Sequence, residues 1–207
     1  MKILSIFLSS ISKYGLKFLI LILIYEIFNL YRLRFSDYIV LNSTKKNFEP
    51  TVPTPYYCLS LLKKNILKKK YNFIDFGCGT GRVINYVKKV ESINKIIGIE
   101  NNSKLRKKLN KLKDSRTKIF INDCSDKKFL DLISIKTKSQ NIILYFYHPF
   151  STQILNMILE KFLFKNKKEI LIIIMGEIFI KNKLKKKFNI KEKKLHKLLN
   201  IYNYKYH

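Results

Sequence analysis

The feature that most constrains this chain is the run Phe73 to Gly81, which reads Phe-Ile-Asp-Phe-Gly-Cys-Gly-Thr-Gly. A short apolar stretch contains an acid, Asp75, and three glycines follow at alternate positions, Gly77, Gly79 and Gly81. Glycines after a buried strand form a turn with no Cβ atoms in the way, so backbone N–H groups can approach a ligand closely. The run therefore predicts a strand, a ligand-binding loop and a helix in succession.

Two common nucleotide-binding loops do not match this spacing. The dinucleotide fingerprint Gly-x-Gly-x-x-Gly needs a further glycine at position 82 or, in the other register, at position 84, and the chain has Arg82 and Ile84 there. A Walker-type phosphate loop needs Gly-Lys-Ser or Gly-Lys-Thr, which does not follow. The pattern that fits is Asp-x-Gly-x-Gly-x-Gly, which resembles the first motif of class I S-adenosylmethionine-dependent methyltransferases. The resemblance implies that the acid and the three glycines form the loop for the cofactor, S-adenosyl-L-methionine.

Two further acids lie at the ends of the next predicted strands. The apolar strand 95–99 is followed by Glu100, 19 residues beyond the last glycine. A carboxylate there can accept hydrogen bonds from both ribose hydroxyls of a nucleotide. A third strand, 118–121, is followed by Asp123, and the resemblance implies that this acid lies beside the adenine amino group. The alternative for both acids is a solvated strand end without a ligand.

The segment 49–56 reads Glu-Pro-Thr-Val-Pro-Thr-Pro-Tyr and precedes a helical pattern over 57–67. Its prolines indicate a rigid turn, with Thr54 as the N-cap of the helix and Pro55 at its first position. The segment also resembles one that folds over the methionine part of the cofactor in some amino-methyltransferases. That resemblance implies cofactor contacts from Thr54 and Tyr56, and the two roles can hold together.

The fourth predicted strand, 141–147, is almost wholly apolar and runs into His148, Pro149 and Phe150. It resembles a pattern of methyltransferases that act on amino groups, in which Asn or Asp followed by Pro-Pro and an aromatic residue holds the acceptor nitrogen. Here His148 stands in the place of Asn or Asp, and only one proline follows. A histidine can hydrogen-bond an acceptor or act as a base near neutral pH. His148 is therefore the candidate catalytic residue, with a tolerated replacement in a weakened enzyme as the alternative.

Apolar strands that alternate with helical segments predict an α/β fold with a parallel sheet and helices on both faces. Further elements are expected over 152–164 (helix), 169–175 (strand), 178–187 (helix), 188–194 (strand) and 201–206 (strand). They complete a Rossmann-like seven-stranded methyltransferase sheet with a terminal antiparallel hairpin, in a class I methyltransferase domain over 48–207 after a linker, 36–47. Residues 51–175 also resemble a group of small, largely uncharacterised methyltransferases with Pro-Thr-Pro-Tyr before the glycine motif and Tyr-Phe-Tyr-Asn-Pro-Phe after it. A more distant similarity is to membrane-anchored lysine methyltransferases of mitochondria.

Residues 1–35 are too apolar for a linker and predict an N-terminal hydrophobic membrane-anchor helix, either spanning or lying in the interface. A spanning helix needs about 20 mostly apolar residues, which 14–31 nearly supplies, with Lys17 near one end where its amine can reach the headgroups. Glu26 costs about 2.5–3.5 kcal/mol inside the hydrocarbon, which the surrounding Leu and Ile can offset. The alternative is an extra helix packed on the domain. Lysines and arginines lie on both sides of the apolar run, so the charges do not decide the orientation in the membrane. The catalytic domain is expected on the cytoplasmic or organelle matrix side, because the cofactor is kept there.

The formal net charge of +28 raises the question of a nucleic-acid partner, because basic chains gain affinity by releasing counterions from phosphates. The 42 basic residues include only five arginines, and the lysines are scattered over nearly every predicted helix, so a nucleic-acid acceptor is not favoured. A basic surface beside an anchor favours anionic lipid headgroups instead. Cys58, Cys78 and Cys124 show no metal spacing, so no metal is implied and a reducing compartment is expected.

The resulting prediction is a membrane-associated S-adenosylmethionine-dependent methyltransferase. The acceptor is expected to be an amino or other nucleophilic group of a protein or small molecule, attacked in line at the sulfonium methyl, with orientation of the acceptor as the main source of acceleration. Two alternatives stay open: a methyltransferase-fold scaffold or binding module with weakened activity, and a nucleic-acid methyltransferase.

Overall fold

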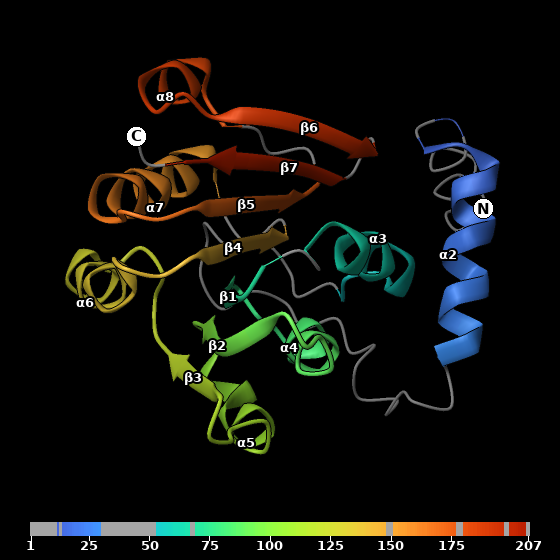
Figure 1. The fold of residues 1–207 in the computed structure, drawn as a ribbon. Coiled ribbons are helices and arrows are strands. Elements are labelled where there is room, and N and C mark those ends of the chain that lie inside the picture. The colour runs from blue at the N-terminus through green and yellow to red at the C-terminus, as the bar shows by residue number, and fades with distance from the viewer. Residues whose placement is uncertain are drawn as a thin grey trace.

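The computed structural model describes residues 12, 14–29, 53–66, 69–147, 151–176, 180–196 and 199–205. His148 and the predicted linker 36–47 lie outside these residues. Seven strands form one sheet in the order β3-β2-β1-β4-β5-β7-β6 (Figure 1). The strands are β1 (Tyr71–Phe76), β2 (Ile93–Glu100), β3 (Thr117–Ile121), β4 (Ile142–Tyr147), β5 (Ile170–Met175), β6 (Lys191–His196) and β7 (Leu199–Tyr204). The predicted seven-stranded α/β fold is confirmed.

Strands β1 to β5 run parallel to one another, while β7 pairs antiparallel with both β5 and β6. The terminal antiparallel hairpin expected from the sequence is therefore present. Its last strand lies at 199–204 rather than at 201–206, because β7 pairs with β5 along the full length of β5. That pairing joins Met175 to Leu199 at one end and Ile170 to Tyr204 at the other.

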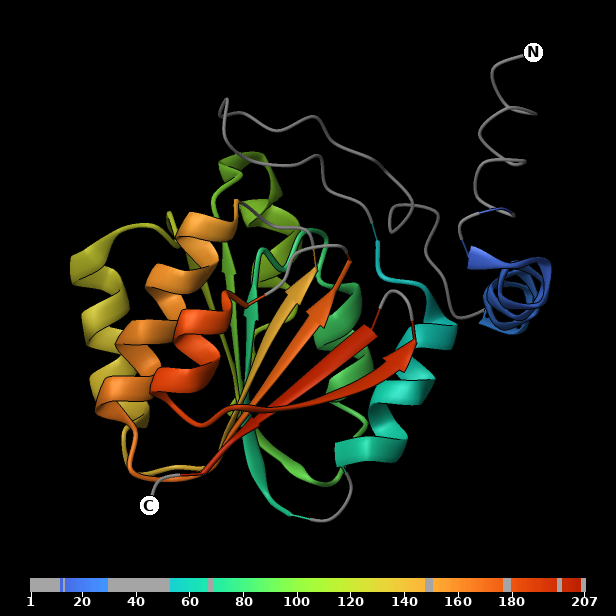
Figure 2. The ribbon, with the colours of Figure 1, turned by 90° about the horizontal axis from the view of Figure 1, so that it is seen from above.

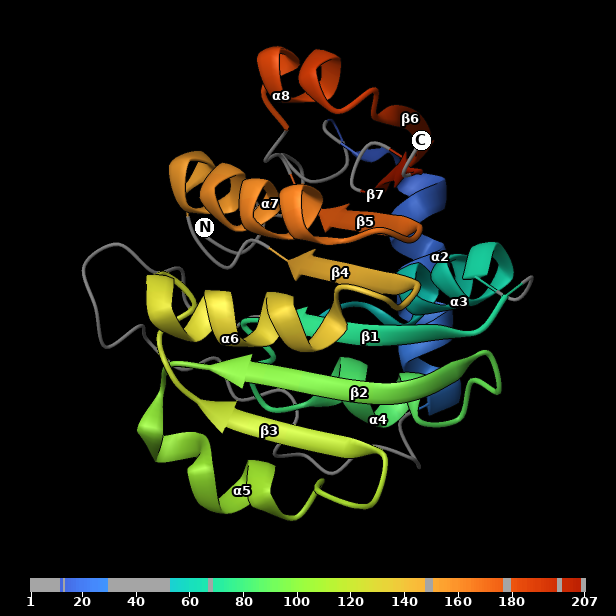
Figure 3. The ribbon, with the colours of Figure 1, turned by 60° about the vertical axis from the view of Figure 1, so that its left-hand side comes forward.

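Helices cover both faces of the sheet in two layers, which Figure 2 shows edge-on and Figure 3 shows across the strands. The layer that contributes to one core holds α3 (Tyr56–Ile66), α4 (Arg82–Val87) and α5 (Arg106–Asn110), the last preceded by the short helix η3 (Ser103–Leu105). The layer that contributes to the other core holds α6 (Lys127–Thr137), α7 (Thr152–Lys165) and α8 (Asn182–Lys187). The central strands are buried on both faces, as their nearly continuous apolar sequences require.

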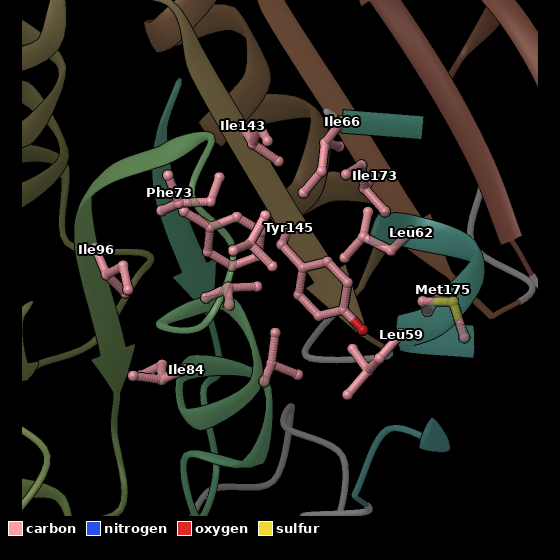
Figure 4. Close-up of a cluster of buried hydrophobic side chains, with 14 of the residues drawn as sticks. Leu59, Leu62, Ile66, Phe73, Ile84, Ile96, Ile143, Tyr145, Ile173 and Met175 are labelled. Carbon is pink, nitrogen blue, oxygen red and sulfur yellow. The ribbon is translucent and has the colours of Figure 1, made fainter. Parts of the chain in front are cut away.

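The first of these cores is built around two stacked rings from neighbouring strands. Phe73 of β1 and Tyr145 of β4 have ring centroids 5.7 Å apart, and both side chains are fully buried. Figure 4 shows them surrounded by aliphatic side chains from α3, α4 and the sheet, among them Leu59 and Ile84. A stacked aromatic pair at this spacing contributes attraction beyond the area it buries.

In the N-terminal hydrophobic segment the structure describes helix α2 (Leu16–Asn29), which lies outside α3 as a further layer (Figures 1 and 2). The rings of Phe18 and Tyr25 pack edge-on against Tyr57 of α3, at 5.6 and 5.3 Å between centroids. This arrangement corresponds to the alternative expected for the segment, a helix packed on the domain. In the part of the chain with described structure, we find no helix with the length and hydropathy needed to cross a membrane.

Candidate functional site

The glycine loop connects β1 to α4 at the carboxyl ends of the parallel strands, where ligands bind in open α/β sheets. All three of its glycines, Gly77, Gly79 and Gly81, have positive φ angles. The loop is anchored on the neighbouring strand, because the N–H groups of Gly77 and Cys78 both donate to the carbonyl of Ile99, at 2.9 and 3.0 Å. The spacing of the glycines therefore reflects a backbone conformation that other residues rarely adopt.

Gly81 also lies close to α5 and to the turn after it. A Cβ atom added at Gly81 would lie 2.2 Å from Cδ1 of Leu112 and 3.3 Å from Cδ2 of Leu109. Its φ angle of +86° adds strain for any other residue. The last glycine of the motif thus lets α4 start directly beneath α5 and fixes the shape of the loop.

Glu100 lies at the end of β2 and holds the glycine loop directly. Its Oε2 accepts a hydrogen bond from the Gly79 N–H at 2.8 Å, and its Oε1 accepts one from the Asn102 N–H at 2.9 Å. Burial raises the pKa of this carboxyl, and the backbone N–H bonds partly oppose that rise. The structure therefore brings together two predicted cofactor residues, and each carboxylate oxygen retains lone-pair capacity for a ribose hydroxyl.

Asp75 lies on β1 beneath the same loop and is buried. Its Oδ2 has no hydrogen-bond partner among the described residues. Burial, together with the nearby charge of Glu100, raises the pKa of Asp75 well above its ordinary value. Two buried carboxyl groups with one orphaned oxygen form a site that favours a ligand with positive charge and hydrogen-bond donors. The amino and sulfonium groups and the ribose hydroxyls of S-adenosylmethionine have that character, so the residues present fit this cofactor.

Asp123 follows β3, the strand next to β2, and is partly buried. Its Oδ1 accepts hydrogen bonds from both the backbone N–H and the hydroxyl of Ser125, at 2.8 and 2.7 Å. The Asn122 N–H donates to the carbonyl of Glu100 at 2.9 Å, which holds the two strand ends together. The structure thus places Asp123 at the predicted edge of the sheet and gives it a role in the turn that leads to α6.

Thr54 is buried just before α3, and its hydroxyl lies 2.9 Å from the hydroxyl of Tyr145 on β4. The prediction that Thr54 caps the helix is wrong. The N–H of Tyr56, the first residue of α3, donates instead to Oε1 of Glu26 in α2 at 2.8 Å. A carboxylate at a helix N-terminus satisfies an orphan donor and also interacts favourably with the helix dipole.

Tyr56 packs against α4 through its ring. The guanidinium carbon of Arg82 lies 4.9 Å from the ring centroid of Tyr56, a cation–π contact. Arg82 is the first residue of α4, and it also donates to the carbonyl of Thr54 at 3.2 Å and to the carboxylate of Glu26. The segment of Thr54 and Tyr56 is thereby attached to the helix that begins at the glycine loop.

The predicted catalytic residue, His148, lies outside the described residues. The strand that leads to it, β4, ends at Tyr147, and burial raises the pKa of that tyrosine to about 12. Because β4 is parallel to β1, its end faces the same edge of the sheet as the glycine loop. The position of His148 in the chain is therefore compatible with the predicted role, which stays a prediction.

Three residues of this region were missed in reasoning from the sequence: Glu26, Arg82 and Tyr145. A lone acid in an apolar helix was the signal for Glu26, since an acid in such a place needs a partner. Arg82 stands where the dinucleotide fingerprint needs a glycine, and nothing in the local sequence indicates its contacts with Thr54 and Glu26. The buried hydroxyl of Tyr145 needed a partner that sequence alone does not identify.

The three cysteines are all buried thiols. Burial raises the pKa of the Cys58 thiol to about 12, and burial also raises that of Cys78 in the glycine loop. Thiols held in this form are poor nucleophiles and poor metal ligands. Among the described residues no group of His, Cys, Asp and Glu is arranged to hold a metal ion.

Comparison with known proteins gives a likeness of fold. No protein-family model matches the chain, and no curated protein matches its sequence. A SAM-dependent methyltransferase from Anabaena variabilis superposes with a TM-score of 0.55 and 12% identity, over 88% of this chain and 92% of that one. An O-methyltransferase family protein from Burkholderia thailandensis superposes with a TM-score of 0.51 and 9% identity, over 72% of this chain and 55% of that one. The chain has the fold of class I methyltransferases, as its motif predicted.

Proposed function

We propose that this protein is an S-adenosylmethionine-dependent methyltransferase. The observation that carries the proposal is the buried pair Asp75 and Glu100 at the glycine loop, with Glu100 hydrogen-bonded to Gly79 and Oδ2 of Asp75 without a partner in the described part of the chain. The fold likeness to proteins described as methyltransferases supports the same reading.

When bound, S-adenosylmethionine would supply an electrophilic methyl group on a positively charged sulfur. Glu100 would accept hydrogen bonds from the ribose hydroxyls, as carboxylates at the end of a second strand do in nucleotide-binding α/β folds. The positive charge of the bound cofactor would favour the ionised form of Asp75, which burial and the charge of Glu100 disfavour without the cofactor. Asp123, at the end of the third strand, would lie beside the adenine amino group, and the segment of Thr54 and Tyr56 would close over the methionine part.

His148 would position the acceptor or take a proton from it. The aromatic residues that flank this position in the sequence, among them Tyr147 and Phe150, favour an acceptor group carried on a side chain or small molecule. We propose an amino or other nucleophilic group of a protein or small molecule as the acceptor. We also propose that the protein is membrane-associated through its N-terminal segment, with the methyltransferase domain on the side where the cofactor is found.

A calorimetric titration with S-adenosylmethionine and with its demethylated product tests the cofactor assignment. Wild-type protein should bind both, and Glu100→Gln should bind at least about tenfold more weakly, because hydrogen bonds to a charged group contribute about 1.5–3 kcal/mol. Glu160→Gln is the matched control, because Glu160 is exposed on α7 on the other face of the sheet. If folded wild-type protein binds neither compound, the proposal that it is an enzyme is wrong, and a scaffold or binding module is favoured.

Methyl transfer itself is tested with labelled cofactor and isolated membranes, lysate proteins and RNA as acceptors, followed by mass spectrometry of the products. His148→Ala should lower the transfer rate and leave the cofactor affinity unchanged. An unaltered rate would remove His148 from the mechanism. Label that enters RNA alone would favour the nucleic-acid methyltransferase.

A further inference from the structure

One face of α2 is apolar and exposed. Its members recur at spacings of three and four residues, which places them along one side of a helix. We call this set the apolar stripe: Leu16, Ile20, Leu23, Ile24, Ile27 and Phe28, each between 39% and 71% exposed. A contiguous apolar surface of this kind marks a site of interaction.

The opposite side of α2 is already engaged with the domain. Phe18 and Tyr25 pack on α3, and Glu26 binds both Arg82 and the first N–H of α3. The direction of the stripe is therefore fixed, because the attached side holds the helix in one rotation. Lys17 is exposed and lies three residues before Ile20 and seven before Ile24, so it is on the stripe side. Its amine can extend toward a polar layer while its methylene chain stays among apolar groups.

A basic groove of about 880 Å³ lies on the same side of the sheet, between α3, α4 and α5. No acidic residue is found among the described residues that line it. We call it the lysine groove after seven of its lining residues: Lys63, Lys88, Lys89, Lys104, Lys107, Lys108 and Lys111. Lys88 is paired with Asp114 at 2.6 Å, whereas Lys89, Lys107 and Lys111 are among the exposed lysines.

The lysine groove reaches the last turn of α2 from the side of the helix that is attached to the domain. Asn29, the last residue of the helix, lines the groove, and the residue before it, Phe28, is the most exposed member of the stripe. In Figure 2, α2 forms the outermost layer on the side of the sheet that carries α3 and α4. An exposed apolar helix bordered by a basic groove has the composition of surfaces that bind anionic membranes.

We propose that the apolar stripe and the lysine groove together form a docking surface for an anionic lipid bilayer. Helix α2 would lie in the plane of the interface, because its attached side stays bound to α3 and only the stripe faces outward. Lipid phosphates would meet the lysines while the stripe enters the boundary of the acyl chains. This inference rests on the membrane association in the proposed function and names its surface and its lipid. A nucleic acid would use the groove alone and would leave the stripe without a role, so the lipid is favoured.

Sedimentation of the full-length protein with vesicles tests the proposal. Wild-type protein should bind vesicles that contain phosphatidylglycerol at least about tenfold more strongly than vesicles of phosphatidylcholine alone, since each lysine near an anionic surface contributes about 1 kcal/mol. The difference should shrink as salt is raised.

Two pairs of matched variants locate the surface. Leu23→Ser with Ile27→Ser should weaken binding to anionic vesicles by roughly tenfold, because burial of apolar side chains drives insertion. Its control is Leu132→Ser with Ile135→Ser, an exposed leucine and isoleucine on α6 in the opposite layer. The groove variant, Lys107→Glu with Lys111→Glu, should abolish the preference for anionic over neutral lipid. Its control, Lys183→Glu with Lys186→Glu on α8, should keep that preference. Circular dichroism and thermal unfolding confirm that each variant is folded.

Three results would overturn the docking surface. They are equal binding to neutral and anionic vesicles, unchanged binding in the stripe and groove variants, and concentration-dependent dimerisation that the stripe variant removes. RNA binding that the groove variant abolishes and the stripe variant leaves intact would also overturn it. Cofactor titration on the same samples separates this inference from the proposed function. A protein that binds the cofactor but not the vesicles would contradict only the proposed docking surface.

Discussion

The carboxylate of Glu26 lies 3.0 Å from Nη1 of Arg82, which ties helix α2 to the first residue after the glycine loop. The same carboxylate accepts the N–H of Tyr56 at 2.8 Å. One acidic side chain therefore joins α2, the start of α3 and the start of α4. Arg82 is almost fully buried, so its positive charge needs a partner of opposite charge. Among the described ion pairs, that partner is Glu26.

Replacing Glu26 should cost the protein stability. Glu26→Ala leaves the buried guanidinium of Arg82 without this carboxylate and should lower the free energy of unfolding by about 2–4 kcal/mol. Glu26→Gln keeps a carbonyl oxygen for the N–H of Tyr56 and should cost less. Denaturant unfolding measures the loss, and amide hydrogen exchange at Tyr56 should quicken in the alanine variant. Glu160→Gln, which alters an exposed ion pair, should change stability by less than about 1 kcal/mol; equal losses in Glu160→Gln and Glu26→Ala would contradict the proposed role of Glu26.

Gly81 and Gly15 allow strain and crowding to be separated, because both have a φ angle of +86°. A Cβ at Gly15 meets no atom within 4 Å, whereas one at Gly81 lies 2.2 Å from Leu112. Gly15→Ala should therefore cost only the backbone strain, about 1–2 kcal/mol. Gly81→Ala should cost about 1 kcal/mol more, because the half-buried side chain of Leu112 must move to make room.

Denaturant unfolding of Gly15→Ala, Gly81→Ala and the double variant Gly81→Ala with Leu112→Ala measures the two contributions. Removal of the Leu112 side chain should recover part of the crowding cost and leave the backbone strain. Cofactor affinity should fall in Gly81→Ala and stay unchanged in Gly15→Ala. Equal losses of stability at the two glycines would mean that crowding by Leu112 contributes nothing.

The raised pKa of Asp75 predicts how stability depends on pH. A carboxyl group with a higher pKa in the folded state holds its proton more tightly there, so its stabilising contribution is full below about pH 3.9, the ordinary value. The contribution is lost as the pH rises through the folded-state pKa. Without cofactor, the melting temperature of Asp75→Asn minus that of wild type should therefore increase as the pH is raised from acid to neutral, because the variant buries no charge.

Asp114 supplies a control of opposite sign. Its pKa is lowered, chiefly by the hydrogen bond from the Lys88 side chain, so its contribution is present above the ordinary carboxyl pKa and is lost as the pH falls. Asp114→Asn should thus lose stability relative to wild type at neutral pH and match it in acid. Melting curves over this pH range test both variants. A difference between Asp75→Asn and wild type that does not vary with pH would show that Asp75 is not held protonated by its site.

The parts of the fold that the sequence predicts are those with strong local signals. Glycines at alternate positions after an apolar strand allow few conformations, so the sequence predicts a loop between β1 and α4 and an acid, Glu100, at the end of the next strand, and both lie there in the structure. Helix α6 was not predicted, although Asp126 caps it by accepting hydrogen bonds from the N–H groups of Lys128 and Phe129. Its apolar residues are interrupted by exposed Leu132 and Ile135, which obscure the helical period.

The connections made by Glu26 could not be predicted from local sequence. Glu26 and Arg82 are 56 residues apart, and their pairing depends on how α2 lies on α3. In the sequence, an acid inside an apolar run resembles a tolerated charge in a membrane helix. In the structure it is the residue that attaches that helix to the domain. Long-range pairs between polar groups leave no periodic pattern along the chain, so they emerge only when the elements are assembled.

The bond between Thr54 and Tyr145 connects the segment before α3 to the centre of the sheet. Both hydroxyls are buried, so removing one leaves the other unsatisfied. Thr54→Val and Tyr145→Phe should each lower the free energy of unfolding by about 1–3 kcal/mol. The double variant should cost less than the sum, because no hydroxyl is then left without a partner. Strictly additive losses in denaturant unfolding would contradict the bond.

The same variants test whether Thr54 contacts the cofactor. Tyr145→Phe keeps the ring that stacks on Phe73 and leaves the Thr54 hydroxyl in place. If the hydroxyl of Thr54 binds the cofactor directly, calorimetric affinity should fall in Thr54→Val and hold in Tyr145→Phe. If Thr54 only fixes the backbone of its segment through Tyr145, the two variants should weaken the affinity equally. Since Arg82 donates to the carbonyl of Thr54 in both cases, the comparison isolates the hydroxyl from the rest of the segment.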